Sequence, residues 1–307
     1  EGNSPFQIVW LDDKDREVLL HDLVKRDNGK ARKMVVYEGN QPMFLIDNTA
    51  FQSATQEAKP PATRAWLGGA MAIKEDTSAT FRATSASNLL IVGQQDETTS
   101  GMIASTLLSL DKQYTLGSVS FQLLDGTPKD SSHASMLADV QSTMAHDVTS
   151  VGVRQVEDTM AAIDVELQQR MKNDNTDDPV MFLVINALHR FRDLRRDEDD
   201  YGFSMGDEDK TKSSSQVLAE LLKEGPPLGM HVIISTDTLA NLNRTFDRQS
   251  LREFDMRVLL QMGANDSTNL IDMPDASRLG MHRALLYSEE TGTIEPFRPY
   301  APPAQGN

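Results

Sequence analysis

The residues best placed to do chemistry lie in the stretch from Asn88 to Leu110. An apolar run, residues 89–92, is followed by Gly93, a polar segment, and a helix-like run that starts at Met102. A strand, a glycine turn and a helix form the context of a phosphate-binding loop, because backbone N–H groups and a helix N-terminus converge on the anion. The pattern of such a loop is G-x-x-x-x-G-K-[ST], and this stretch keeps its first glycine, Gly93, and its hydroxyl residue, Ser100. We therefore predict the scaffold of a nucleotide site whose main cation is missing.

The altered positions of this pattern all weaken its attraction for phosphate. The second glycine falls on Thr98 and the lysine on Thr99, so the β- and γ-phosphates of a nucleotide lose their cation. Gln94 is a further polar residue of the predicted loop, and Asp96 and Glu97 bring negative charge into it. A carboxylate about 4 Å from a phosphate costs on the order of several kcal/mol at an effective dielectric constant near 20.

Strand-like and helix-like segments alternate along most of the chain, which predicts a parallel sheet covered on both faces. Predicted strands span 119–128, 179–185, 230–236, 255–262 and 282–287, and predicted helices span 153–171, 216–223 and 266–273. In open parallel sheets, ligands bind at the carboxyl ends of strands, so we expect Asp125 to lie near the site.

The two ends and one insertion of the chain have a different character. Residues 1–60 predict a small N-terminal α+β and linker region, and residues 296–307 an extended, proline-rich tail. Residues 190–215 are a charged insertion, which we interpret as a solvated loop. The shorter predicted elements are strands at 5–11, 34–39 and 43–46, a helix at Asp15–Arg26, a linker at 51–63, and a hairpin at 65–74 that turns at Gly68-Gly69.

Composition excludes several functional classes. The 307 residues carry a formal net charge of −16, so the domain alone is a poor non-specific binder of nucleic acid. The chain has no cysteine and therefore no disulfide or thiolate chemistry, and its six histidines show no metal-ligand spacing. It has no membrane-spanning apolar run or signal peptide, which predicts a cytoplasmic location. Because it begins at Glu1 rather than Met, we expect it to be a piece of a longer protein.

The order of these segments resembles the motor domain of the FtsK/SpoIIIE/HerA family of hexameric DNA translocases, over about residues 65–290. NLLIVG is similar to the strand before the family's Walker A loop, and VMFLVINALHRF to its Walker B strand. LAELLKEGPPLGMHVIISTDT is similar to the helix, turn and sensor strand that follow. The resemblance implies an α/β, RecA-like P-loop NTPase fold, with a mostly parallel central sheet flanked by helices over residues 61–295.

The resemblance also implies that the catalytic positions have changed. The Walker B aspartate, which supports Mg²⁺, aligns with Asn186, and the glutamate that polarises water aligns with Ala187. The sensor glutamine aligns with Asp237, and the arginine that the family supplies to a neighbouring subunit aligns with Thr268. Ser100 and Asn186 are the residues left to contact Mg²⁺, so no metal site and no catalytic residue is assigned.

We interpret the chain as a catalytically degenerate ATPase domain that acts as a structural or regulatory module. Its expected partners are other domains of a longer polypeptide, copies of itself or an active ATPase, and no cofactor is assigned. One alternative is an unorthodox ATP-binding subunit of a DNA or protein translocase. In that case Mg²⁺-ATP is held by Ser100, Ser105, Asp125 and Asn186, and the cation comes from a neighbouring protomer or from Arg190, Arg192, Arg244 or Arg248. A second alternative is a partner-recognition domain that uses the acidic insertion Asp197–Asp209 or the hairpin near Leu67.

Overall fold

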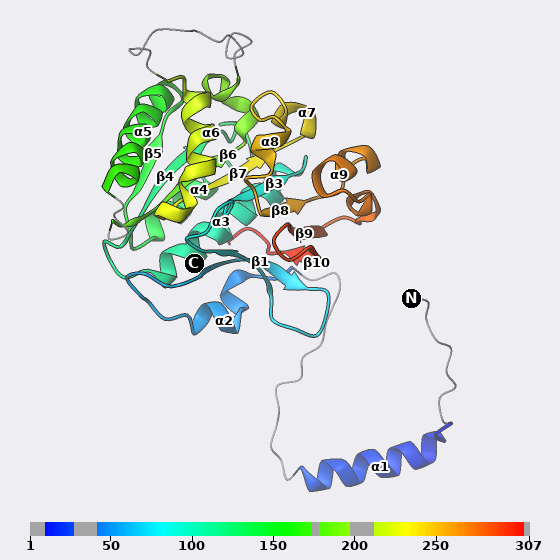
Figure 1. The fold of residues 1–307 in the computed structure, drawn as a ribbon. Helices are drawn as coiled ribbons and strands as arrows, with labels where there is room; N and C mark the ends of the chain where they lie inside the picture. The colour runs from blue at the N-terminus through cyan, green and yellow to red at the C-terminus, as the bar shows by residue number, and fades with distance from the viewer. Residues whose placement is uncertain (1–9, 28–41, 174–177, 197–211, 304–307) are drawn as a thin grey trace. The chain divides into compact units, whose positions relative to one another are not determined.

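A computed structural model describes residues 10–27, 42–173, 178–196 and 212–303 (Figure 1). The chain divides into two compact units, Glu1–Gln41 and Pro42–Asn307. The described part of the first unit contains α1, Asp13–Arg26, which confirms the predicted helix. Residues 34–39 and most of 5–11, both predicted as strands, lie outside the described residues. The predicted division at residues 60 and 295 stays a prediction.

The second unit is built on one ten-stranded mixed sheet, ordered β2-β1-β10-β9-β8-β3-β7-β6-β4-β5 among the described residues. Six neighbouring strands, from β8 to β5, run parallel, and the other four pair antiparallel at one side. The sheet confirms the predicted fold class. The strands are β1 Thr63–Ala70, β2 Thr77–Phe81, β3 Leu89–Val92, β4 Val119–Asp125, β5 Val148–Val151, β6 Val180–Asn186, β7 Met230–Thr236, β8 Met256–Leu259, β9 Ala284–Ser288 and β10 Thr293–Pro299.

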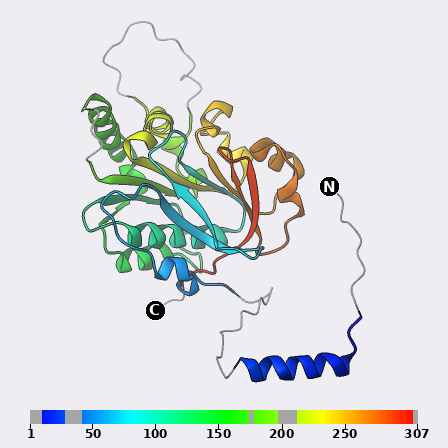
Figure 2. The same ribbon diagram turned by 60° about the horizontal axis from the view of Figure 1, so that its bottom comes forward.

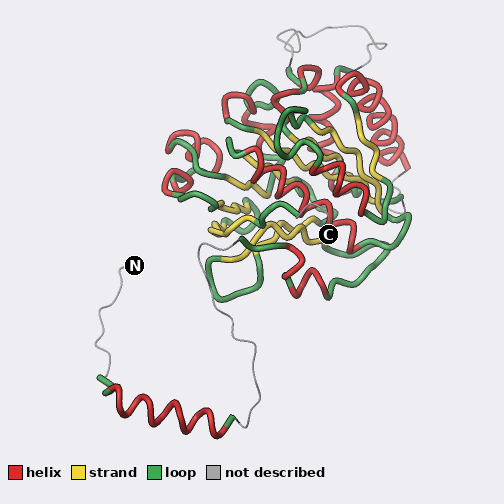
Figure 3. Tube along the Cα trace, turned by 180° about the vertical axis from the view of Figure 1, so that it is seen from behind, coloured by secondary structure: helices red, strands yellow, loops and turns green. Residues whose placement is uncertain are grey.

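Helices cover both faces of this sheet (Figures 2 and 3). The central strands read as continuous apolar runs, and β3, β6 and β7 are almost wholly buried, as expected of strands that are covered twice. The helices of this unit are α2 Thr49–Gln52, α3 Asp96–Gln113, α4 Met136–Thr143, α5 Val156–Asn173, α6 Ser214–Glu224, α7 Leu239–Leu242, α8 Arg248–Leu251 and α9 Ala264–Ile271. None of the helices in the described part of the chain is long and apolar enough to cross a membrane.

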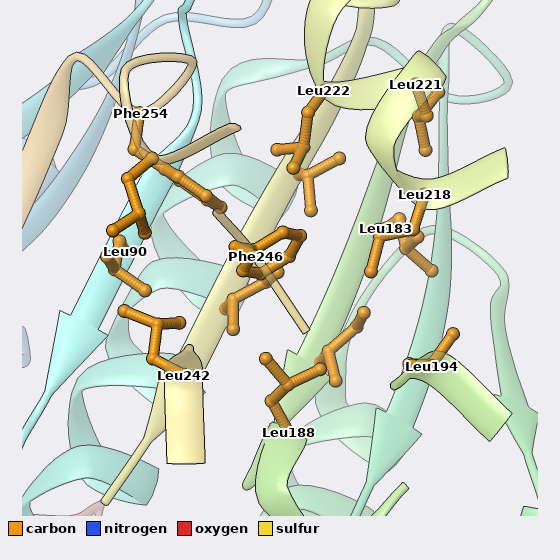
Figure 4. Packing of buried hydrophobic residues seen from close by; sticks show 14 of the residues in the cluster. Leu90, Leu183, Leu188, Leu194, Leu218, Leu221, Leu222, Leu242, Phe246 and Phe254 are labelled. Atoms are coloured by element: carbon orange, nitrogen blue, oxygen red, sulfur yellow. The ribbon is translucent and has the colours of Figure 1, made fainter. Parts of the chain in front are cut away.

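Alternate residues of the central strands supply two separate cores. Leu90 and Leu183 face α5, α6 and the short helices α7 and α8, and they pack in the cluster that contains Phe246 and Phe254 (Figure 4). Their neighbours on the same strands, such as Leu89, face α3 and α4 in the second cluster. The period of two along each strand therefore decides which helix layer a side chain contacts.

The second core contains an aromatic group that connects β2 to the central strands β6 and β7. Phe81 of β2 packs edge-on against Phe182 of β6, with ring centroids 5.3 Å apart. Phe182 stacks on His231 of β7, also at 5.3 Å, and His231 Nδ1 lies 2.8 Å from the carbonyl oxygen of Ser87. Burial lowers the pKa of His231 to about 4, although the bond to this carbonyl acts in the opposite direction.

Two predicted elements are wrong, and both lie where local sequence competes with packing. The strand predicted at 43–46 is mostly a 3₁₀ turn, Leu45–Asp47, which leads into α2. The hairpin predicted at Gly68-Gly69 does not exist, because both glycines lie inside β1. A Cβ atom on Gly68 would stand 2.0 Å from the carbonyl oxygen of Arg298, so this glycine permits β10 to approach β1.

The start and the end of the second unit are joined beside β1. The first four residues of the predicted tail, 296–299, belong to β10. Beyond them, the Tyr300 hydroxyl accepts a bond from Asn48 Nδ2 at 2.9 Å and donates to Asp76 Oδ2 at 2.6 Å. The Ala301 N–H donates to the carbonyl of Met43 at 2.7 Å. In the charged insertion, 190–196 form short 3₁₀ turns, and 197–211 lie outside the described residues.

Replacing Gly68 by Ala will destabilise the second unit by about 3 kcal/mol or more, because the new methyl group overlaps backbone atoms that cannot move aside. Denaturant-induced unfolding measures the loss. Gly280→Ala is the matched control: no atom lies within 4 Å of its Cβ position and the residue is exposed outside helices and strands, so stability should change by less than about 0.5 kcal/mol. Equal effects of the two variants would contradict the close approach of β10.

The buried ring of His231 predicts a loss of stability in acid. The unfolded chain binds a proton near the ordinary pKa of 6.5, whereas the folded chain resists protonation down to about pH 4. Stability is therefore intact above pH 6.5 and falls by about 3 kcal/mol as the pH drops to 4. His231→Phe should reduce this pH dependence in unfolding experiments, whereas His21→Phe, at an exposed site, should leave it unchanged. Identical pH profiles for the wild type and His231→Phe would contradict the assignment.

Candidate functional site

The predicted site residues gather at one edge of the sheet, where four neighbouring parallel strands end. Gly93 follows β3, Asp125 ends β4, Asn186 ends β6, and Asp237 follows β7. Asp125 and Asn186 are register partners, and the Gly93 N–H donates to the carbonyl of Thr236 at 2.9 Å. The parallel sheet thus brings together residues from four separate parts of the sequence.

The loop predicted between Gly93 and Met102 is much shorter than expected. Helix α3 begins at Asp96, so only three residues separate it from β3. The Thr99 N–H already donates to the Gln95 carbonyl at 2.9 Å, as in any helical turn. Two acidic residues in the first turn favour this early start, because carboxylates interact well with a helix N-terminus. An anion at this position would therefore contact a hydrogen-bonded helical turn, and not a loop that surrounds it.

The loop residues themselves fall into two groups. Gly93, Thr99 and Ser100 line a hollow at the sheet edge. Gln94 is exposed, and Thr98 contacts Gln95 through its hydroxyl, 3.3 Å from Oε1; neither of the two lines the hollow. The Thr99 hydroxyl donates to the Asp96 carbonyl at 3.0 Å, so the residue at the lysine position turns back onto its own helix.

Asn186 is the centre of the site and is 2% exposed. Its Nδ2 atom lies 3.0 Å from Asp125 Oδ1, 2.9 Å from Thr127 Oγ1 and 3.2 Å from Ser100 Oγ, and it donates towards these three oxygens. Its Oδ1 atom accepts from the Ser235 hydroxyl at 2.7 Å. A carboxylate can only accept hydrogen bonds, so the amide nitrogen must face Asp125, and the orientation of the amide is fixed.

These contacts decide how well the cluster fits Mg²⁺. Magnesium prefers oxygen ligands, most of all carboxylates, in octahedral geometry. The Asn186 amide instead places a nitrogen donor between Ser100 and Asp125, and Asp125 Oδ1 also accepts from the Thr127 N–H at 2.9 Å and the Thr127 hydroxyl at 2.6 Å. The donor set at Ser100 and Asn186 therefore does not fit the metal of a nucleotide site.

Ala187 occupies the position for which the resemblance implies a catalytic glutamate. Its backbone is left-handed, with φ of 59°, which is uncommon for a residue other than glycine. Its N–H donates to the Ser235 hydroxyl at 2.9 Å, which joins it to the Asn186 network. Opposite it, a Cβ atom on Gly126 would stand 2.8 Å from the Asn186 carbonyl oxygen. The backbone at Ala187 is in the left-handed conformation, but the methyl side chain of this alanine cannot polarise water.

Asp237 is held in place by its neighbours and is half-buried. Asn241 Nδ2 lies 2.9 Å from each carboxylate oxygen, and Thr238 Oγ1 lies 3.2 Å from one of them. Burial acts to raise the pKa of Asp237, but these hydrogen bonds outweigh it and lower the pKa below its ordinary value. Asp237 is thus an ionised, oriented carboxylate at the place where a phosphate would approach.

His189 and Arg190 complete the hollow, and they lie two and three residues after Ala187 in sequence. His189 Nδ1 lies 3.5 Å from Asp237 Oδ1 without hydrogen-bond geometry. Burial lowers the pKa of His189; the charge of Asp237 opposes this effect, and that of Arg190 supports it. At neutral pH, Arg190 is therefore the cation in the lining of the hollow.

The hollow is small for the site of a nucleotide. It contains about 310 Å³ of empty space even when that space is counted out to open solvent, which is at the lower end of the range for ligand pockets. His133, Thr127, His189 and Ser235 also line the hollow and were not among the predicted site residues. Each lies within the last two residues of a predicted strand or within five residues after one, and this position is the signal that could have identified them. Of the four predicted arginines, the lining contains Arg190.

Replacing Asn186 by Asp should destabilise the second unit by about 3 kcal/mol at pH 7, because two carboxylates then meet near 3 Å without a proton between them. The repulsion raises the folded pKa of the pair above its unfolded value, so the lost stability returns as the pH falls through this raised pKa. Unfolding at several pH values measures the effect.

The control for this variant removes the second charge. In Asn186→Asp combined with Asp125→Asn, the repulsion is gone, and most of the stability should return. A single variant as stable as the wild type, at every pH, would contradict the hydrogen-bond assignment at Asn186. Stabilisation of the single variant by Mg²⁺ would show that this edge of the sheet binds metal once its charge is restored.

No protein-family model and no curated protein matches this sequence. Similar solved structures include EccC of Thermomonospora curvata (ATPases 2 and 3, in complex with a signal sequence peptide), which is 17% identical with a TM-score of 0.57 over 80% of this chain and 44% of that one. EssC of Geobacillus thermodenitrificans (ATPases 2 and 3) is 12% identical, with a TM-score of 0.55 over 88% of this chain and 49% of that one.

The conjugation coupling protein TcpA of pCW3, solved as a monomer with ATPγS, is also similar, at 12% identity and a TM-score of 0.53 over 80% of this chain and 67% of that one. The chain spans about a third of the cytoplasmic domain of EccC, at 32%. Identities this low concern the fold alone. The second unit therefore has the RecA-like fold of FtsK/SpoIIIE-type ATPase domains.

Proposed function

We propose that this chain is a catalytically silent RecA-like domain that serves as a structural or regulatory module of a larger translocase-type ATPase. The observation that carries the proposal is the hydrogen-bond network around Asn186, whose amide nitrogen bridges Ser100 and Asp125. In an active P-loop ATPase the serine of the Walker A loop and the Walker B aspartate hold Mg²⁺. Here the serine is kept as Ser100, but the position of the aspartate is taken by Asn186, whose amide nitrogen donates to Ser100 and to Asp125.

Electrostatics support the proposal. Phosphoryl transfer depends almost entirely on positioning and on cations that stabilise the developing charge. This site has Thr99 in place of the lysine, Ala187 in place of the catalytic glutamate, and an ionised Asp237 in place of the sensor glutamine. If a single catalytic group were lost, a group from another part of the assembly could replace it. Here the cation and the residue that orients water are lost together.

The length of the similar proteins supports a modular role. EccC and EssC carry several ATPase domains, and this chain matches less than half of each two-domain structure. We infer that the module contacts other domains of a longer polypeptide, copies of itself or an active ATPase. One of the similar structures is described as a cytoplasmic domain, and we place this module in the cytoplasm as well.

Arg190 favours a second candidate function, an unorthodox ATP-binding subunit. Its guanidinium is exposed, lines the hollow together with Ser100, and makes no hydrogen bond or ion pair within the described residues. It could supply the charge that Thr99 lacks. The similar protein TcpA was solved with ATPγS. Opposing this function are the carboxylates of Asp96 and Asp237 in the same lining.

Calorimetric titration of the chain with ATP and Mg²⁺ distinguishes these functions. For a silent module we expect no heat of binding up to millimolar nucleotide, which corresponds to a Kd above about 1 mM. Micromolar binding that is lost in Ser100→Ala and Arg190→Ala would contradict the silent module and support the subunit. Arg192→Ala is the matched control, since this arginine is exposed and outside the lining.

A further inference from the structure

The hollow at the sheet edge is lined by two carboxylates that have no cation beside them. Asp237 is ionised and oriented by Asn241, and its side chain is 26% exposed. Asp96, in the first turn of α3, lines the same hollow and is exposed to solvent. Within the described residues, neither carboxylate has a lysine or arginine nitrogen within 4 Å.

His189 lies near both carboxylates and adds a polar atom without a partner. Burial lowers the pKa of His189, and the charges of Asp237 and Asp96 oppose this effect, so both carboxylates lie close enough to act on the ring. The ring is therefore neutral at pH 7. Its Nδ1 atom is buried, lies 3.5 Å from Asp237 Oδ1 and makes no hydrogen bond within the described part of the chain. Buried polar atoms are normally paired, so this atom indicates a partner from outside.

The cation that the hollow already contains does not provide this partner. Arg190 lines the hollow, but among the described residues its guanidinium forms no ion pair with Asp96 or Asp237. The lining thus contains two carboxylates and one guanidinium, and the whole chain carries a net charge of −16. Both the local and the overall charge therefore attract a cationic ligand.

We propose that the hollow receives an arginine side chain from a partner domain, whose guanidinium pairs with Asp237 and Asp96. A guanidinium carries five N–H donors in a planar fork, enough to reach a carboxylate and also His189 Nδ1 in the tautomer that is protonated at Nε2. A space of about 310 Å³ suits the end of one side chain better than a whole nucleotide. This inference rests on the function proposed above, because a nucleotide in the same hollow would exclude the arginine.

Nuclear magnetic resonance of the complete chain at pH 7 and low ionic strength tests the hollow, with Nα-acetyl-arginine amide as the probe. The probe should shift the side-chain signals of Asn241 and His189, with a Kd of about 1–10 mM. Nα-acetyl-citrulline amide has nearly the same shape but no charge, so it should bind at least about tenfold more weakly.

Substitutions in the lining separate a specific contact from general attraction to an acidic protein. Asp237→Asn should weaken binding of the arginine probe at least about tenfold, and Asp96→Asn, at an exposed position, about threefold. Glu97→Gln is the matched control. It removes one negative charge directly after Asp96, but Glu97 is exposed and outside the lining, so binding should change by less than about twofold.

Arg190→Ala distinguishes arginine binding from nucleotide binding, because the two respond in opposite directions. Removal of the positive charge should strengthen binding of the arginine probe by about twofold at low ionic strength, and this gain should disappear in high salt. The same variant would weaken binding of ATP.

Two results would overturn the proposal. One is the absence of any shift of the Asn241 and His189 signals up to about 100 mM probe. The other is probe binding that Asp237→Asn leaves unchanged, which would place the contact on another acidic surface. If neither ATP nor the probe binds, this inference alone fails and the silent module stands. Micromolar binding of ATP would contradict the silent module and, with it, the basis of this inference.

Discussion

The amide of Asn186 is the interaction on which the candidate site depends. It joins the ends of β4, β6 and β7 to helix α3 through bonds to Asp125, Ser235 and Ser100. In an active nucleotide site a metal ion and phosphates connect these elements, so their spacing changes with each catalytic cycle. The network around Asn186 needs no metal ion or phosphate, and its low-dielectric surroundings strengthen each hydrogen bond. The sheet edge is consequently fixed without a ligand.

The early start of α3 and this network reinforce each other. Because the helix begins at Asp96, Ser100 lies in its second turn, buried against β6, at the distance at which Asn186 reaches it. The same start closes the helical hydrogen bond at Thr99, which removes a donor that a phosphate would need. The acidic first turn and the Asn186 network therefore act in one direction: both stabilise the polypeptide alone and disfavour an anion.

Much of the fold could be predicted because continuous apolar runs such as 179–185 and 230–236 mark the buried strands of a parallel sheet. Asp125, Asn186 and Asp237 could be expected to lie together, because the carboxyl ends of neighbouring parallel strands meet at the same edge of the sheet. The errors have local causes. Glycines in β1 indicated a turn, whereas Gly68 serves the close approach of β10, a contact more than two hundred residues away in sequence. The hydrogen-bond partners of Asn186 and the burial of His189 depend on three-dimensional packing and could not be predicted.

Strand β10 connects the β1–β2 pair to the rest of the sheet. It lies between β9 and β1, so this attachment depends on residues 293–299. Directly after β10, the Tyr300 hydroxyl forms hydrogen bonds with Asn48, near the start of the unit, and with Asp76, just before β2. A fragment that stopped at residue 295, where composition suggests a tail, would detach two strands and expose Trp66 and Phe81 to water. Such a fragment would aggregate, whereas one running from Pro42 to Pro303 keeps every strand paired.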